Sequence, residues 1–107
     1  MSEARPGPVE EPTYRLRLFV AGNTVRSRLA IENLRLFCTK YLAGRFDLEV
    51  VDIHQQPELA ERNQIVAAPT LLRMEPLPMR RIVGDLSQTE RLLRGLDVVP
   101  TPGEVAP

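Results

Sequence analysis

Apolar residues recur at regular spacing along the chain, and the spacing predicts short alternating elements. Residues 14–20 alternate apolar and polar side chains with period two, which is typical of a strand. Residues 25–43 repeat with helical spacing, and Gly44 follows as a stop signal. A second strand is expected at 46–53, where apolar residues on both faces indicate an inner position in an α/β sheet. This strand–helix–strand unit predicts two parallel strands joined by a right-handed crossover.

The second half of the chain has shorter elements. Pro57 begins a short helix that ends near residue 63, and two strands are expected at 70–74 and 79–83. Three prolines frame these two strands: Pro69, Pro76 and Pro78. An X-Pro bond costs only about 0.5–1 kcal/mol to hold in cis, so the first strand is expected to be entered through a cis bond.

The C-terminal part of the pattern is a helix followed by an ambiguous segment. Residues 87–90 read Ser-Gln-Thr-Glu, a capping-box pattern that predicts a helix through Arg94 with Gly95 at its end. Residues 96–99 are apolar and β-branched but few, so they fit either a frayed end or a strand. The resulting order, strand–helix–strand–helix–strand–strand–helix, is that of an α/β thioredoxin fold.

Composition limits the possible functions. The 107 residues suffice for one domain, expected at 13–99, between a disordered tail at 1–12 and a proline-rich tail at 100–107. The formal net charge is zero, which argues against a broad attraction to nucleic acid. No long apolar run or signal-peptide pattern occurs, so we expect no membrane association and a cytoplasmic location.

Residue types that carry catalysis are missing from the expected places. Thioredoxin-type chemistry needs two cysteines at the first strand–helix junction, and residues 21–27 contain none. Cys38 is the only cysteine and falls within the apolar stripe of the first helix, which predicts a packed, inert thiol. His54 is the only histidine, and a metal site needs three or four ligands. The sequence therefore predicts a binding module without cofactors rather than an enzyme.

Several segments resemble the KaiB family of circadian clock proteins. They read LFVAGNT at 18–24, PELAE at 57–61, APTL at 68–71, RRIVGDLS at 80–87 and GLD at 95–97. The resemblance covers residues 14–99 and implies a non-enzymatic, metamorphic protein. Its second half would be βααβ in a ground-state homotetramer, a dimer of dimers, and αββα in a switched, thioredoxin-like monomer.

The resemblance also implies partners and functional residues. The switched monomer would bind a KaiC-type ATPase ring, modulate its phosphorylation cycle, sequester KaiA, and compete with a sensor kinase that carries a KaiB-like domain. The partner-binding candidates are polar: Asn23, Thr24, Asn63, Arg80 and Arg81. The fold-switch candidates are Pro69, Pro76, Pro78, Gly95 and Asp97.

Alternatives remain open at this point. The three prolines also suit plain turns, and the two arginines also suit salt bridges within the chain or between subunits. A static thioredoxin-like adaptor or sensor domain in stress signalling would share the predicted fold but stay monomeric at all concentrations. A redox or detoxifying enzyme is the weakest hypothesis, because a single thiol cannot cycle as a dithiol.

Overall fold

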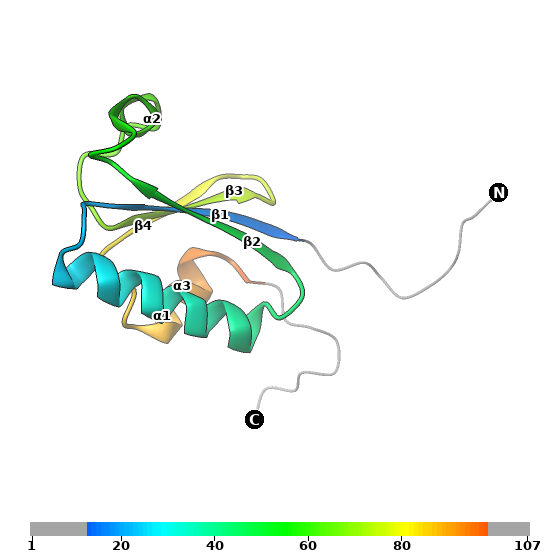
Figure 1. Ribbon diagram of the computed structural model, residues 1–107. Coiled ribbons are helices and arrows are strands. Elements are labelled where there is room, and N and C mark those ends of the chain that lie inside the picture. Colours follow the sequence, from blue (N-terminus) through cyan, green and yellow to red (C-terminus); the bar gives the residue numbers. More distant parts are fainter. Residues whose placement is uncertain (1–12, 99–107) are drawn as a thin grey trace, which may run out of the picture.

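The computed structural model describes residues 13–98 (Figure 1). The elements follow in the order β1 (Tyr14–Val20), α1 (Val25–Tyr41), β2 (Phe46–Asp52), α2 (Pro57–Arg62), β3 (Thr70–Glu75), β4 (Arg80–Val83) and α3 (Thr89–Gly95). This is the order predicted from the sequence. Where an element end differs from the prediction, the shift is one or two residues. The two tails expected at 1–12 and 100–107 lie outside the described residues.

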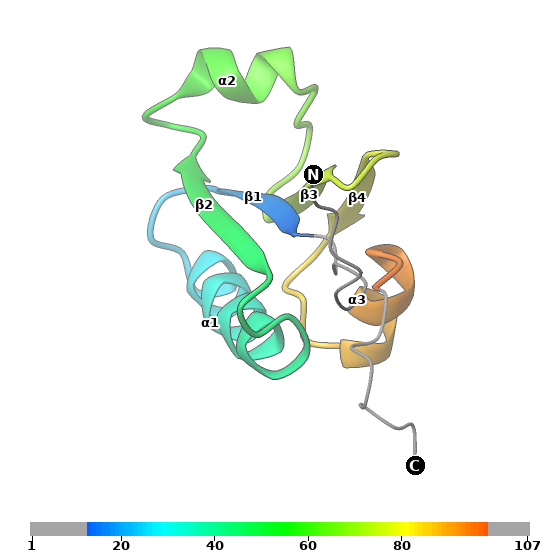
Figure 2. The ribbon, with the colours of Figure 1, turned by 90° about the vertical axis from the view of Figure 1, so that its right-hand side faces the viewer.

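The four strands form one mixed sheet in the order β2-β1-β3-β4. β1 is parallel to β2 and antiparallel to β3, and β4 is antiparallel to β3. The predicted parallel pair is therefore confirmed. Two views at right angles show α1 and α3 on one face of the sheet and α2 on the other (Figures 1 and 2). This three-layer arrangement gives the sheet two separate apolar faces.

The alternation within β1 supplies both faces of the core. Leu16 and Leu18 point toward α1 and α3, whereas Phe19 points toward α2, and all three side chains are buried. Each such burial stabilises the fold by about 1.5–3 kcal/mol. The helix α1 closes the larger cluster with a stripe of buried side chains: Ala30, Leu34, Phe37 and Cys38.

The position predicted for the second strand was wrong. Among the described strands β2 lies at the edge and pairs only with β1, and its residues Phe46 and Val50 remain 37% and 36% exposed. Within β2 only Val51 is buried. The apolar pattern of a strand reports how much surface it could bury. It does not report whether a strand pairs on each side, whereas the acidic residues Asp47, Glu49 and Asp52 are the kind of charged side chains that edge strands carry.

The predicted capping box was also wrong. α3 begins at Thr89 after Gln88, whose side chain makes no capping hydrogen bond. Ser87 instead donates its amide N–H to Oδ1 of Asp85 at 3.1 Å, which fixes the turn before the helix. Beyond α3, Leu96 is buried as the C-cap residue and Asp97 adopts a left-handed φ of +55°. Residues 96–98 thus continue the helix end in this arrangement and do not form a strand.

The three prolines that frame β3 and β4 follow cis peptide bonds: Ala68–Pro69, Glu75–Pro76 and Leu77–Pro78. The cis entry predicted for the first strand of the second half is confirmed at Pro69. Its carbonyl accepts the N–H of Gly84 at 2.9 Å, so the start of β3 is joined to the residue that follows β4.

Candidate functional site

A hydroxyl network occupies the junction between β1 and α1. Thr24 is the N-cap of α1, and its Oγ1 accepts the Ser27 N–H at 3.2 Å. The two hydroxyls are 2.9 Å apart, and the buried Ser27 Oγ accepts the N–H of Ala21 at 3.0 Å. Asn23 and Thr24 themselves are exposed. The junction is therefore held rigid while it presents two polar residues to solvent.

No reactive group accompanies this junction. Cys38 lies in the interior of α1's buried stripe, and burial raises the pKa of its thiol to about 12. A thiol with such a pKa stays protonated at neutral pH and is a poor nucleophile. His54 is exposed, and among the residues that the structure describes no group of three His, Cys, Asp or Glu side chains could hold a metal ion.

The Thr24 cap can be tested directly. Thr24→Ala removes the acceptor for the Ser27 N–H and is expected to lower the free energy of unfolding by about 1 kcal/mol. Thr24→Ser keeps a hydroxyl and should retain most of that stability. Thr39→Ala, at an exposed position inside α1, is the matched control and should be neutral or slightly stabilising. Equal urea midpoints for Thr24→Ala and Thr39→Ala would contradict the capping role.

The adjacent arginines Arg80 and Arg81 point to opposite faces of the sheet. In β4 the pairing places Arg80 opposite Arg73 and Arg81 opposite Leu72. Leu72 belongs to the α2-side cluster, whereas Arg73 donates to a carbonyl at the end of α3. The sequence grouped the two arginines as one set of polar contacts, but a strand alternates its side chains. They consequently belong to two separate clusters.

The first cluster lies on the α2 side. The Arg81 guanidinium donates from Nη1 to the Gln64 carbonyl at 3.1 Å and from Nη2 to the Asn63 carbonyl at 3.0 Å. Asn63 is the C-cap of α2, and its side-chain Nδ2 donates to the Leu59 carbonyl at 2.8 Å. This polar fork joins the end of α2 to β4 while Arg81 stays exposed.

The second cluster lies at the C-terminal end of α3. Arg80 forms an ion pair with Asp97 at 3.9 Å, and both side chains are largely exposed. Beneath them Arg73 is only 2% exposed and donates to the carbonyls of Leu96 and Pro78. The structure thus brings together three of the fold-switch candidates, Pro78, Gly95 and Asp97, around one buried cation.

Arg73 was not singled out from the sequence, although a signal was present. It lies two residues after Leu71 in a predicted strand, and period two places both side chains on the same, apolar face. A cation at such a position predicts a buried group with specific hydrogen-bond acceptors. Among the described residues Arg73 forms no ion pair, and its Nε has no hydrogen-bond partner.

Gly95 allows α3 to pack closely on β4. A Cβ placed there would lie 2.5 Å from Cδ1 and 2.9 Å from Cγ1 of Ile82, a buried core residue. The missing side chain therefore sets how near the end of α3 comes to the sheet. Gly95 ends the helix without a left-handed φ, so close approach and not backbone freedom is what this position uses here.

The fold and its polar clusters define a class of protein: a thioredoxin-like domain whose thiol site is replaced by a capped helix start. The family model described as the KaiB domain matches residues 17–98, and the chain belongs to the KaiB family. The family is one of non-enzymatic clock proteins, and this chain is not an enzyme.

Two curated relatives illustrate the similarity. The chain is 45% identical over 85 residues to the circadian clock protein KaiB3 of Synechocystis sp., with 79% of this chain and 83% of the relative covered. It is 48% identical over 87 residues to the circadian clock oscillator protein KaiB of Synechococcus sp. strain RCC307, with 81% of this chain and 79% of the relative covered.

Solved structures agree on the fold. The N-terminal domain of SasA from Synechococcus elongatus superposes with a TM-score of 0.67 at 24% identity, covering 91% of this chain and 94% of that domain. Mitochondrial thioredoxin 3 of Saccharomyces cerevisiae superposes with a TM-score of 0.66 at 16% identity, covering 82% of this chain and 80% of the thioredoxin. Across residues 13–98 no helix is both long and apolar enough to cross a membrane.

Proposed function

We propose that the chain is a fold-switching regulator that binds a KaiC-type ATPase ring in the cytoplasm and modulates its phosphorylation cycle. Membership of the KaiB family and the relatives named as clock oscillator proteins support this proposal. The observation that supports the proposal most strongly is the order of the elements. The described chain has the arrangement that the family resemblance assigns to the switched, partner-binding state.

The local contacts are consistent with a switch in the second half. The end of α3 is joined to the β3–β4 hairpin by the hydrogen bonds of Arg73, by the exposed pair Arg80–Asp97 and by the close packing of Gly95 on Ile82. An exposed ion pair stabilises by only about 0–1 kcal/mol. Two packings of one sequence that differ by a few kcal/mol are the physical requirement for such a protein.

The proposed partners follow the family. In addition to the ATPase ring they include KaiA and a competing sensor kinase with a KaiB-like domain, and the alternative state would be a homotetramer built as a dimer of dimers. Asn23 and Thr24 extend the proposed contact surface to the start of α1. The partner-contact and fold-switch roles of individual residues stay predictions.

One experiment tests the proposal as a whole. Size-exclusion chromatography with light scattering, run over a dilution series, should show slow exchange between tetramer and monomer. Adding a purified KaiC-type ring should shift the monomer into a ring complex. Backbone NMR should then show two sets of signals for residues of the second half. One set of signals, unchanged by dilution or by the ring, would refute the switching regulator.

A static adaptor or sensor domain is the second candidate, and one observation favours it. Leu96, which the tetrameric state would use in a strand, is fully buried here at the end of α3. A residue that fills the core of one fold stabilises that fold by about 1.5–3 kcal/mol. The adaptor predicts a monomer at every concentration in the same light-scattering experiment.

A further inference from the structure

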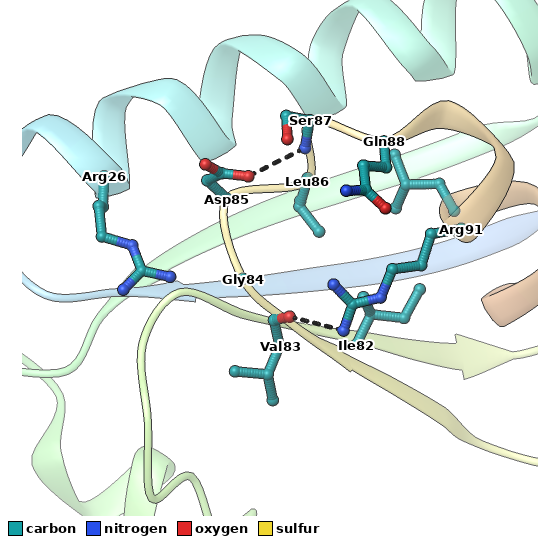
Figure 3. A pocket seen from close by; sticks show the side chains of 10 residues that line it. Arg26, Ile82, Val83, Gly84, Asp85, Leu86, Ser87, Gln88 and Arg91 are labelled. Carbon is teal, nitrogen blue, oxygen red and sulfur yellow. Dashed lines mark hydrogen bonds between the residues drawn. The ribbon is translucent and has the colours of Figure 1, made fainter.

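A pocket of about 250 Å³ lies where the second half of the chain meets the start of α1 (Figure 3). Its floor is the segment that runs from the end of β4 to the start of α3, residues 82–88. Arg26 on the first turn of α1 and Arg91 on α3 provide its positive side chains. None of the residues predicted from the sequence as partner contacts lines this pocket.

Within residues 13–98 neither arginine lies within ion-pair distance of a carboxylate, although the charge of Arg26 acts on Asp85. Arg91 donates from Nη2 to the Val83 carbonyl at 3.2 Å, and its Nη1 lies 3.7 Å from the position that a Cβ would take on Gly84. In Figure 3 the guanidiniums of Arg26 and Arg91 lie on either side of Gly84.

Asp85 is the only acidic residue lining the pocket, and it is already engaged. Its carboxylate accepts hydrogen bonds from the Ser87 hydroxyl and the Ser87 N–H, and these, with the charge of Arg26, lower its pKa. Figure 3 shows the carboxylate turned toward Ser87. Two cations against one bound anion leave the lining with a net positive charge.

We propose that this pocket receives the carboxylate of an aspartate or glutamate side chain from the protein partner, bound between Arg26 and Arg91. An arginine fork matches a carboxylate geometrically and donates two hydrogen bonds to it. The volume is large enough for one acidic side chain and too small for a folded segment. The inference rests on the proposed function, since it names the chemistry by which that partner is recognised.

The surroundings of the pocket favour a protein carboxylate over a free anion. Val83 lines the pocket and is 41% exposed, and Val25, next to Arg26, is 60% exposed. Arginine is enriched at protein–protein interfaces, and a protein partner can cover the exposed apolar side chains beside it, whereas a free anion gains nothing from them. Asn23 and Thr24 continue the same surface at the start of α1.

The site is assembled only when α3 and the end of β4 lie beside the start of α1. Its two cations come from the two halves of the chain, more than sixty positions apart in sequence. A partner carboxylate in this pocket would therefore bind the described arrangement in preference to any in which the second half is rearranged. A ligand shifts a conformational equilibrium by its differential affinity for the two states.

The test compares matched arginine variants of the full chain. The double variant Arg26→Gln/Arg91→Gln is expected to bind the KaiC-type ring at least 10-fold more weakly than the unmodified chain, with an unchanged circular-dichroism spectrum. Arg94→Gln is the control, because Arg94 lies on α3 but outside the pocket and, within residues 13–98, is paired only with Glu90. It should bind within about 2-fold, as expected for an exposed pair.

A double-mutant cycle then identifies the carboxylate. Exposed acidic residues of the ring are changed singly to the amide, and one of them should weaken binding without adding to the loss in the arginine variant. Failure of the unmodified chain to bind the ring would refute the proposed function itself. Normal binding by the double arginine variant, or additivity for every acidic residue, would refute the pocket alone.

A last arm distinguishes a free anion from a protein carboxylate. Inorganic phosphate is titrated into the unmodified chain while the NMR signals of residues 84–88 are followed. Weak shifts that do not saturate at millimolar phosphate support a site completed by a protein partner. Saturable submillimolar binding, abolished by the double variant, would overturn the proposal in favour of a phosphate site.

Discussion

Arg73→Ala is expected to lower the free energy of unfolding of the described fold by about 3–4 kcal/mol. The substitution removes a large, 2% exposed side chain, and truncation of buried side chains of comparable size costs about 2–5 kcal/mol. It also leaves the buried Leu96 carbonyl without its donor, which adds about 1–3 kcal/mol, and removes the donor to the partly buried Pro78 carbonyl. Relaxation of the cavity offsets part of this sum, which gives the intermediate value. Urea denaturation followed by circular dichroism, at a concentration where light scattering shows a monomer, measures the loss.

Two further variants separate packing from hydrogen bonding. Arg73→Met fills most of the volume, so its expected loss of about 1–3 kcal/mol reports the net effect of removing the guanidinium: two lost donors, offset by loss of the unpartnered Nε. Arg35→Ala, at an exposed position of α1, should change stability by less than about 0.5 kcal/mol. If Arg73→Ala matched Arg35→Ala, the buried guanidinium would not be what joins the hairpin to α3.

The charge-reversed double variant Arg80→Glu/Arg81→Glu is expected to weaken binding to the KaiC-type ring at least 30-fold, or about 2 kcal/mol. Both side chains are exposed and face opposite sides of the sheet, so the reversal alters the polar surface at both clusters. Truncation of arginines at protein interfaces often costs this much, and reversal adds like-charge repulsion. Isothermal titration calorimetry with the purified ring measures the affinity.

The single variants show which face the ring contacts. Arg80→Glu removes only an exposed ion pair and should leave the fold intact, whereas Arg81→Glu also removes the donors to the end of α2. Arg62→Glu, an exposed arginine at the end of α2, controls for overall charge. Unaltered affinity in the double variant, with native circular dichroism, would exclude both arginines from the contact surface.

Local sequence rules predicted most of the elements but not how the start of α3 is fixed. The alternation of residues 14–20 and the helical repeat after Thr24 involve neighbours a few positions apart, so the bounds of β1 and the start of α1 follow directly. Ser87 matched a capping pattern, but its N–H bonds to Asp85 instead. Serine, threonine and aspartate offer several competing local hydrogen bonds, and the packing of the loop decides between them.

The candidate site was less predictable because its contacts join residues that are far apart in the chain. The motif residues Asn63 and Arg81 could be named from the sequence, but not that Arg81 binds the Asn63 carbonyl. The pocket between Arg26 and Arg91 and the burial of Arg73 involve residues far apart in the chain. Charged side chains usually remain in solvent, so only the period-two position of Arg73 on an apolar strand face indicated its burial, and its distant acceptors could not be named.

The sequence by itself determined the order of the elements, the absence of a dithiol and the family, because each depends on residue type and short-range spacing. Only the tertiary structure decided that β2 lies at the sheet edge, that Arg81 binds the end of α2 while Arg80 pairs with Asp97, and that a buried arginine joins the hairpin to α3. These properties depend on which surfaces meet across long stretches of chain. Such meetings are selected by the packing of the whole domain and are not recorded in any local pattern.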